Sequence, residues 1–200
     1  MKASFLWSIV CVGLAVLALD SNAELIDNGS YTTDTRTNLD WLDLTETVNL
    51  TFDYVDSQLG PGGEFEGWEY ADYWDIEGLF DSAGGTGPYS GWSSANDGVV
   101  ADLLALWGET ASTGGSISSQ FVTGDYDHSM PGWRYWGMVY DDNPWDDYLE
   151  PWEGSTSPAN SGSWLGHALI RQCDKQEIVG SRKDLVAAAQ PGPSEAVRVE

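Results

Sequence analysis

Three aromatic residues stand among acidic ones in one segment of the chain, residues 141–162. They are Trp145, Tyr148 and Trp152. An exposed aromatic ring beside carboxylates suits binding of a sugar, which stacks on the ring and donates hydroxyl hydrogen bonds to the acids. We predict that these three residues contact a ligand, most plausibly a glycan. The alternative, that the rings pack the segment onto the rest of the domain, is equally compatible with the sequence.

The same segment gathers carboxylate oxygens, which are the ligands that calcium prefers. The chain has no EF-hand spacing, and Glu150-Pro151-Trp152 matches only part of the motif that marks the calcium-dependent sugar site of animal C-type lectins. Calcium is therefore the one cofactor that the residues suggest. Its candidate ligands are four aspartates, Asp141, Asp142, Asp146 and Asp147.

Signals for catalysis are weak. The sequence contains neither a GxSxG nor an HExxH pattern, and its two histidines are His128 and His167. His167 falls in a predicted strand, which favours a structural role, whereas His128 lies in an acidic loop and is a candidate ligand. Among so many acids, no carboxylate pair stands out as a glycosidase pair. We predict a non-enzymatic binding domain; a secreted glycan hydrolase with two loop carboxylates and a structural extracellular protein without a small ligand remain open.

The charge of the chain is strongly one-sided. Asp and Glu total 32 against 8 Lys and Arg, which gives a formal net charge of −24. Between Glu24 and Ile170 the basic residues are Arg36 and Arg134, which we interpret as structural counter-charges. A surface of this sign repels nucleic acid and anionic lipid, so neither is an expected partner. The balance becomes neutral near residue 171, which marks a boundary before a tail over 172–200.

The first twenty-three residues resemble a secretory signal peptide. Lys2 supplies the positive start, Phe5–Leu19 is apolar, and Ser21-Asn22-Ala23 fits a cleavage site. The apolar stretch is shorter than the ~20 residues that a membrane-spanning helix needs. We therefore expect a mature chain that begins at Glu24, is secreted or periplasmic, and is not inserted in the membrane. Cys173 would be its one cysteine, so no intramolecular disulfide is expected.

The patterns of the remaining chain predict one domain with mixed elements. Helices are expected where apolar residues recur at helical spacing after a capping residue, and strands where β-branched and aromatic residues alternate. Residues 141–162 are expected to form one long loop. The predicted strands cover residues 30–33, 39–44, 117–123, 135–140 and 163–171, and the predicted helices follow Thr51, Asp72 and Asp97, with another over 181–189.

Four tryptophans in or beside these elements are expected to be core residues, because an aromatic ring brings a large buried area to a domain without disulfides. They are Trp41, Trp68, Trp74 and Trp107.

Two stretches carry a resemblance to a known group of proteins. The segment Leu25–Phe80, with TDT, LDWLDLT and GGEFEGWEYA, resembles the N-terminal half of secreted bacterial proteins of the PEP-CTERM type, and GSWLGHALIR resembles their last strand. This group is similar, more distantly, to the C-terminal domain of collagen-like bacterial adhesins. The resemblance implies an α+β, C-type-lectin-like fold over residues 24–171, with an opening hairpin, two to three short helices and an irregular antiparallel sheet.

Two features depart from that group. Where its members usually read WRYAT, this chain has Trp68-Glu69-Tyr70-Ala71-Asp72, so a basic position has become acidic. Residues 172–200 lack the Pro-Glu-Pro motif, the apolar helix and the arginine cluster of the sorting signal. The expectation is therefore free secretion rather than anchoring at the cell surface.

Overall fold

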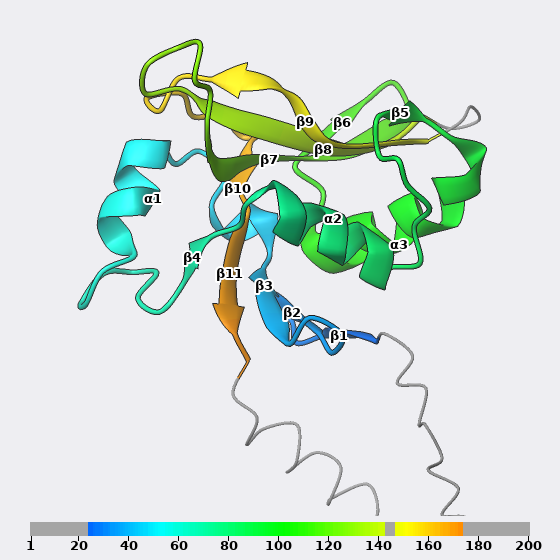
Figure 1. The fold of residues 1–200 in the computed structure, drawn as a ribbon, viewed down its shortest axis with the longest axis horizontal. Helices are drawn as coiled ribbons and strands as arrows, with labels where there is room; N and C mark the ends of the chain where they lie inside the picture. Colours follow the sequence, from blue (N-terminus) through cyan, green and yellow to red (C-terminus); the bar gives the residue numbers. More distant parts are fainter. Residues whose placement is uncertain (1–23, 143–146, 174–200) are drawn as a thin grey trace, which may run out of the picture.

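The structure is a computed structural model that describes residues 24–142 and 147–173. The predicted signal peptide, Trp145, Asp146 and the predicted tail helix lie outside the described residues. Two sheets and three α-helices make up this part of the chain, which confirms an α+β fold (Figure 1).

The first sheet joins the beginning and the end of the described chain. All its pairs are antiparallel, and the closing strand β11 (Leu169–Gln172) lies beside β3 (Leu39–Leu42). The predicted opening hairpin is confirmed as β2 (Tyr31–Asp34) and β3, with β1 (Leu25–Asp27) as an additional strand. In the turn between them, the buried Asp34 carboxylate accepts hydrogen bonds from Arg36 N–H and from the hydroxyls of Thr37 and Ser82. The strand order is β1 (Leu25–Asp27), β2 (Tyr31–Asp34), β3 (Leu39–Leu42), β11 (Leu169–Gln172) and β4 (Glu69–Tyr70).

The first two helices begin directly after the predicted capping residues, and the third begins at Asp97, one residue earlier than expected. Thr51 accepts a hydrogen bond from Tyr54 N–H at the start of α1 (Phe52–Gln58). Asp72 and Asp75 form a capping box at the start of α2 (Tyr73–Ser82). The third helix, α3 (Asp97–Trp107), ends at Gly108 as expected. Two 3₁₀ turns complete the set, η1 (Leu44–Glu46) and η2 (Ser94–Asn96).

The second sheet contains the long strands. Its order is β10 (Gly166–His167), β7 (Ser116–Tyr126), β8 (Arg134–Asp141), β9 (Tyr148–Thr156) and β5 (Gly91–Trp92), and β6 (Ala111–Thr113) pairs with β7. The pair β10–β7 is parallel and the others are antiparallel. The predicted strand over 163–171 is thus divided into β10 in this sheet and β11 in the first.

The prediction of one long loop over residues 141–162 is wrong, because β9 occupies its middle. Pro151, which argued against a strand, lies where the register between β8 and β9 shifts, and such bulges tolerate proline. The bulge brings the backbones close together: a Cβ atom on Gly137 would lie 2.6 Å from the carbonyl oxygens of Glu150 and Pro151. A glycine is therefore required opposite the proline.

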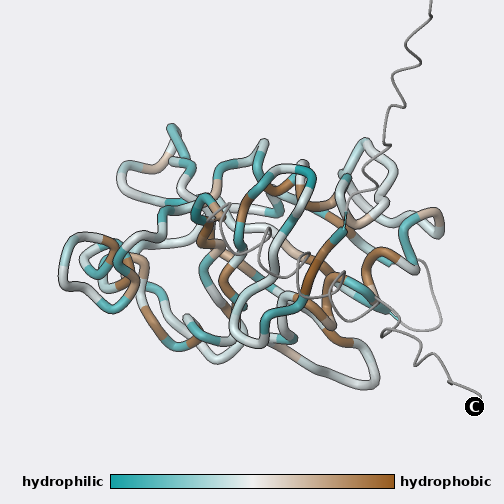
Figure 2. The backbone as a smooth tube through the Cα atoms, turned by 90° about the horizontal axis from the view of Figure 1, so that it is seen from below, coloured by the Kyte–Doolittle hydropathy of each residue, from teal (hydrophilic) through white to brown (hydrophobic). Residues whose placement is uncertain are grey.

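The core lies between the two sheets, where α3 packs against β7, β8 and β9 on one side and β2 on the other. Figure 2 shows that the most hydrophobic stretches run mainly through the interior. Trp41 and Trp107 are buried there with their rings edge to face at 5.5 Å, as predicted. Trp68 is half-buried. Trp74 is 73% exposed, so its assignment to the core is wrong. Within the described part of the chain, no helix has both the length and the apolar character needed to cross a membrane.

Candidate ligand-binding surface

Four aromatic side chains form a continuous surface where α2 begins beside the second sheet. The Tyr73 ring contacts the rings of both Trp74 and Trp152, with centroids 5.0 and 4.8 Å apart. Trp152 in turn stacks on Tyr135 of β8 at 4.4 Å and an interplanar angle of 15°. We call Tyr73, Trp74, Tyr135 and Trp152 the aromatic platform.

The N-terminal cap of α2 fixes the helical half of the platform. Asp72 accepts a hydrogen bond from Trp74 N–H at 2.8 Å, and Asp125 of β7 accepts one from Tyr73 N–H, also at 2.8 Å. Ile76, Leu79 and Phe80 bury the core face of the helix. Successive residues of a helix are about 100° apart, so Trp74, two positions before Ile76, faces away from the core.

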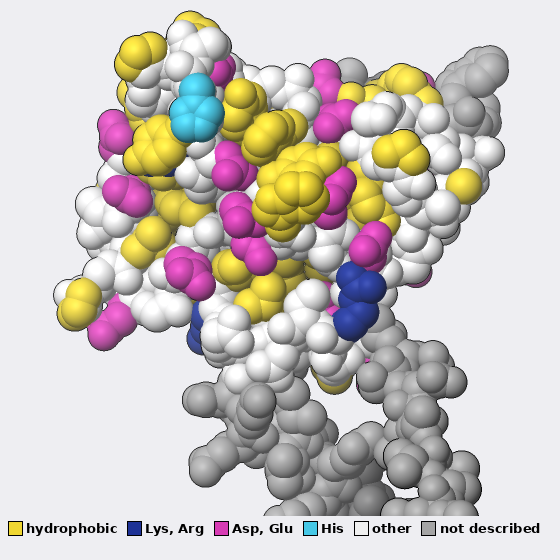
Figure 3. Space-filling model, viewed as in Figure 1, with side chains coloured by type: hydrophobic (Ala, Val, Ile, Leu, Met, Phe, Trp, Pro, Cys, Tyr) yellow, Lys and Arg dark blue, Asp and Glu magenta, His cyan; other side chains and the backbone are white. Residues whose placement is uncertain are grey.

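The platform is accessible to solvent. Trp74 is 73% exposed and Trp152 is 41% exposed, while Tyr73 and Tyr135 are half-buried beneath them. Figure 3 shows hydrophobic side chains gathered over the start of α2 and the adjoining strands, with acidic side chains around them. An exposed apolar patch with a polar rim is typical of an interaction site.

The negative charges of two glutamates act on the Tyr73 side chain. The Tyr73 hydroxyl donates a hydrogen bond of 2.6 Å to Glu77, and this bond, together with burial and the charges of Glu77 and Glu150, raises the pKa of Tyr73 to about 12. Burial also raises the pKa of Glu150, although the Trp152 N–H that donates to Glu150 opposes the shift. The platform therefore has carboxylates placed to accept hydrogen bonds or to hold a cation.

Tyr148, the second predicted contact residue, belongs to a different ring cluster. It packs against Trp92 of β5 with ring centroids 5.0 Å apart, and Trp92 also contacts Tyr140. The Tyr148 hydroxyl donates a short hydrogen bond to Glu153, and burial followed by this bond raises its pKa. The structure thus places Tyr148 and Trp152 on one strand but in two separate groups of rings.

Three of the four candidate calcium ligands are described, and they lie near one another. Burial raises the pKa of Asp147 to about 6, and the charges of Asp141, Asp97 and Asp142 contribute to the shift. Asp142 also accepts a hydrogen bond from the Ser116 hydroxyl. Among residues 24–142 and 147–173, no group of acidic, histidine or cysteine side chains has the arrangement of a metal site. Asp146 lies outside these ranges, and calcium binding stays a prediction.

The two histidines differ in their surroundings. His167 is fully buried; its Nε2–H donates to Leu50 O, and its Nδ1 accepts from the Tyr70 hydroxyl at 2.9 Å. Burial lowers the pKa of His167 to about 4, so its structural role fits the prediction. His128 is exposed in the connection between β7 and β8.

The two arginines of the acidic body also have partners inside the fold. Arg36 bridges to Asp81 and donates to Ser82 and Gly78, which ties the β2–β3 turn to α2. The Arg134 guanidinium lies between the rings of Phe52 and Tyr126, 4.0 and 3.3 Å from their centroids. The first is a counter-charge, as predicted, whereas the second is held by aromatic faces.

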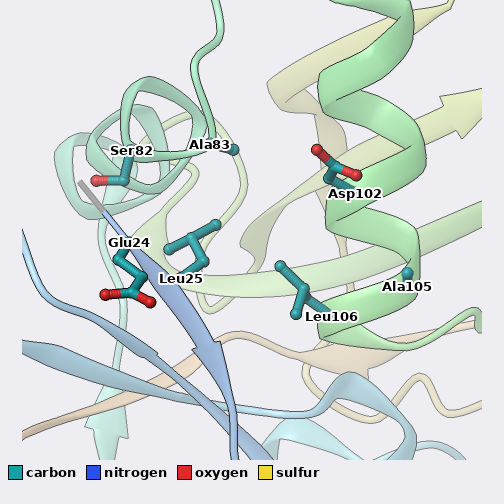
Figure 4. Close-up of a pocket in the computed structure, with 7 residues that line it drawn as sticks. All are labelled: Glu24, Leu25, Ser82, Ala83, Asp102, Ala105 and Leu106. Atoms are coloured by element: carbon teal, nitrogen blue, oxygen red, sulfur yellow. The ribbon is translucent and has the colours of Figure 1, made fainter. Parts of the chain in front are cut away.

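A surface hollow of about 490 Å³ lies at the other end of α2, between β1 and α3 (Figure 4). Leu25 and Leu106 lie at its centre, and the carboxylates of Glu24 and Asp102 lie on opposite sides. None of the described residues that line it is aromatic, so these residues do not supply a ring that stacks on a sugar.

Sequence reasoning missed Tyr73, Trp74 and Tyr135 as members of a surface. The spacing of Trp74 from Ile76 in the α2 pattern could have identified the exposed ring, but no pattern places Tyr135 beside Trp152 before β9 is known. Comparison of the chain with family models, with curated proteins and with solved structures gives no match.

Proposed function

We propose that this domain is a non-enzymatic carbohydrate-binding domain that recognises an extracellular glycan through the aromatic platform. The observation that carries the proposal is the pair of exposed indole rings, Trp74 and Trp152, both in contact with the Tyr73 ring. A sugar ring presents an apolar face that stacks on indole, while its hydroxyls can donate to Glu77 and Glu150. Rigid aromatic anchors also lose little conformational entropy on binding.

The proposed site differs from the segment that the sequence indicated. Trp152 is retained from residues 141–162, and residues of α2 and β8 join it. Because a helix and strands hold the rings, the surface is preorganised. The trio of Trp145, Tyr148 and Trp152 is replaced by a platform in which Trp74 is the most exposed ring.

The wider assignments are proposals of the same kind. We propose a C-type-lectin-like arrangement, which is supported by the order of an opening hairpin, helices and a later strand-rich half. The resemblance to secreted bacterial PEP-CTERM-type proteins and the predicted signal peptide support an extracellular or periplasmic location.

The proposal is tested by titrating the protein with soluble β-1,4-linked glucose hexasaccharide in a calorimeter. We expect Trp74→Ala and Trp152→Ala each to weaken binding at least about tenfold, since anchor residues at the centre of an interface often contribute more than ~1.4 kcal/mol. The control is Trp164→Ala. The Trp164 side chain is 39% exposed, similar to the 41% of Trp152, but it lies beside β10 at the opposite edge of the sheet. Equal affinities of all three variants and the parent would contradict the proposal.

The same sample separates the alternatives. Release of reducing sugar would instead identify a hydrolase, and the loss of that release in Glu150→Gln or Glu153→Gln would identify its carboxylates. Absence of binding across a broad glycan array, with and without calcium, would leave a structural protein. Calcium-dependent binding that Asp147→Asn removes would identify the predicted cation site.

A further inference from the structure

The charges around the aromatic platform indicate which glycans it prefers. Four carboxylates approach Tyr73 and Trp74: Asp72 and Asp125 accept from the backbone, Glu77 accepts from the Tyr73 hydroxyl, and Glu150 acts on the same side chain electrostatically. A helix N-terminus normally attracts anions, but here Asp72, Asp75 and Asp125 already occupy it. The start of α2 is therefore already occupied by acids and does not attract a carboxylate or sulfate group.

The basic residues of the described chain do not offset these acids. Residues 24–142 and 147–173 contain three arginines and no lysine, and the contacts of each arginine lie outside the platform. Arg36 contacts Asp81 at 3.4 Å and Arg171 contacts Asp40 at 3.0 Å. Arg134 precedes Tyr135 of the platform, but its guanidinium is enclosed by two rings. In Figure 3 the basic side chains lie mainly toward the first sheet, away from the hydrophobic patch.

Exposed indole rings beside carboxylates also bind cations. An ammonium group placed over the face of tryptophan is attracted by the ring, and the attraction adds to that of nearby carboxylates. Trp74 offers such a face, and Glu77 lies one helical turn from Tyr73. A sugar that carries a free amino group would satisfy both features at once.

We propose that the platform selects amino-sugar polymers, in which the sugar rings stack on Trp74 and Trp152 and the ammonium groups pair with Glu77 and Glu150. This inference rests on the proposed glycan-binding function and narrows it. Neutral polymers of the same linkage bind more weakly, and polymers of uronic acids are repelled.

The test uses three β-1,4-linked hexasaccharides of equal length, built from glucose, N-acetylglucosamine or glucosamine, together with an oligouronate. We expect the glucosamine hexamer to bind at least about tenfold more tightly than the other two at low ionic strength, and the difference to shrink as salt rises to about 0.5 M. Glu77→Gln with Glu150→Gln should remove this preference, so that the double variant binds the glucosamine and glucose hexamers with affinities within about twofold of each other. Glu109→Gln, an exposed acid beside β6, is the matched control.

The outcomes separate the two proposals. If the three hexamers bind equally and the tryptophan variants weaken all of them, glycan binding stands and the amino-sugar preference is overturned. If none of the three binds, both are overturned. If the glucosamine hexamer binds but Trp74→Ala has no effect, attraction to the general negative charge explains the binding and both proposals are again overturned. Tighter binding of the oligouronate contradicts the preference directly.

Discussion

At the scale of single residues, the buried polar groups of this chain serve the fold, and the exposed rings are free for function. Asp34, Asp40 and His167 are all nearly inaccessible and fully engaged in hydrogen bonds. The first two lie in the TDT and LDWLDLT stretches, so those stretches are explained by their structural roles. Trp74 has no comparable role, because most of its surface faces solvent.

The clearest residue-level prediction concerns His167. Its pKa, measured from histidine ring signals by NMR, should be about 4, because burial disfavours the charged ring. The unfolded chain binds the proton more readily, so this residue removes stability as pH falls from about 6.5 to about 4. The ring should also be the Nε2–H tautomer, since Leu50 O can only accept. A midpoint at or above 6.5 would contradict the assignment.

At the scale of elements, side-chain chemistry explains which parts of the fold were predictable. The caps at Thr51 and Asp72 and the helical spacing after Asp97 identified all three helices. The strand β9 was not predictable, because Pro151 within it argues for a loop unless the partner strand supplies Gly137 at the same level. That pairing joins residues of different strands and cannot be read from either one alone. The same pairing of β8 with β9 brings Tyr135 beside Trp152, so their contact could not be predicted from the sequence either.

The β8–β9 bulge gives a direct prediction. Gly137→Ala should destabilise the protein by about 2–4 kcal/mol, since the new methyl group would lie 2.6 Å from two carbonyl oxygens and from the Phe121 ring. The control is Gly98→Ala in α3, where the added atom meets nothing within 4 Å; it should stabilise the protein by about 0.5–1 kcal/mol. Urea denaturation measures both. A neutral Gly137→Ala would show that the bulge is not constrained as described.

At the scale of the whole molecule, the strong negative charge opposes folding through self-repulsion. Two carboxyls are held under strong desolvation: burial raises the pKa of Asp43 and of Asp147 to about 6, with neighbouring acids adding to each shift. At these two sites the folded state therefore binds more protons than the unfolded chain between about pH 4 and 6. The two carboxyls thus make the protein more stable as pH falls through that range. They oppose the effect of His167.

This balance can be tested with Asp147→Asn. The variant should be more stable than the parent by about 1–2 kcal/mol at pH 7, where the ionised carboxylate is unfavourable, and equal to it at pH 4, where the carboxyl is protonated. Asp102→Asn, an exposed aspartate on α3, controls for the loss of one charge. An equal gain at both pH values would show that desolvation of Asp147 is not the cause.

The glycan is proposed to bind at the surface formed by Trp74 and Trp152, and indole N–H signals in a nitrogen–proton NMR spectrum report on each ring separately. Signals are assigned by single Trp→Phe substitutions, and the protein is titrated with the glucosamine hexamer. We expect the Trp74 and Trp152 signals to shift together along one saturating curve, while those of Trp92 and Trp164 stay in place. Saturable shifts confined to Trp92 or Trp164, or no saturable shift at any indole, would contradict it.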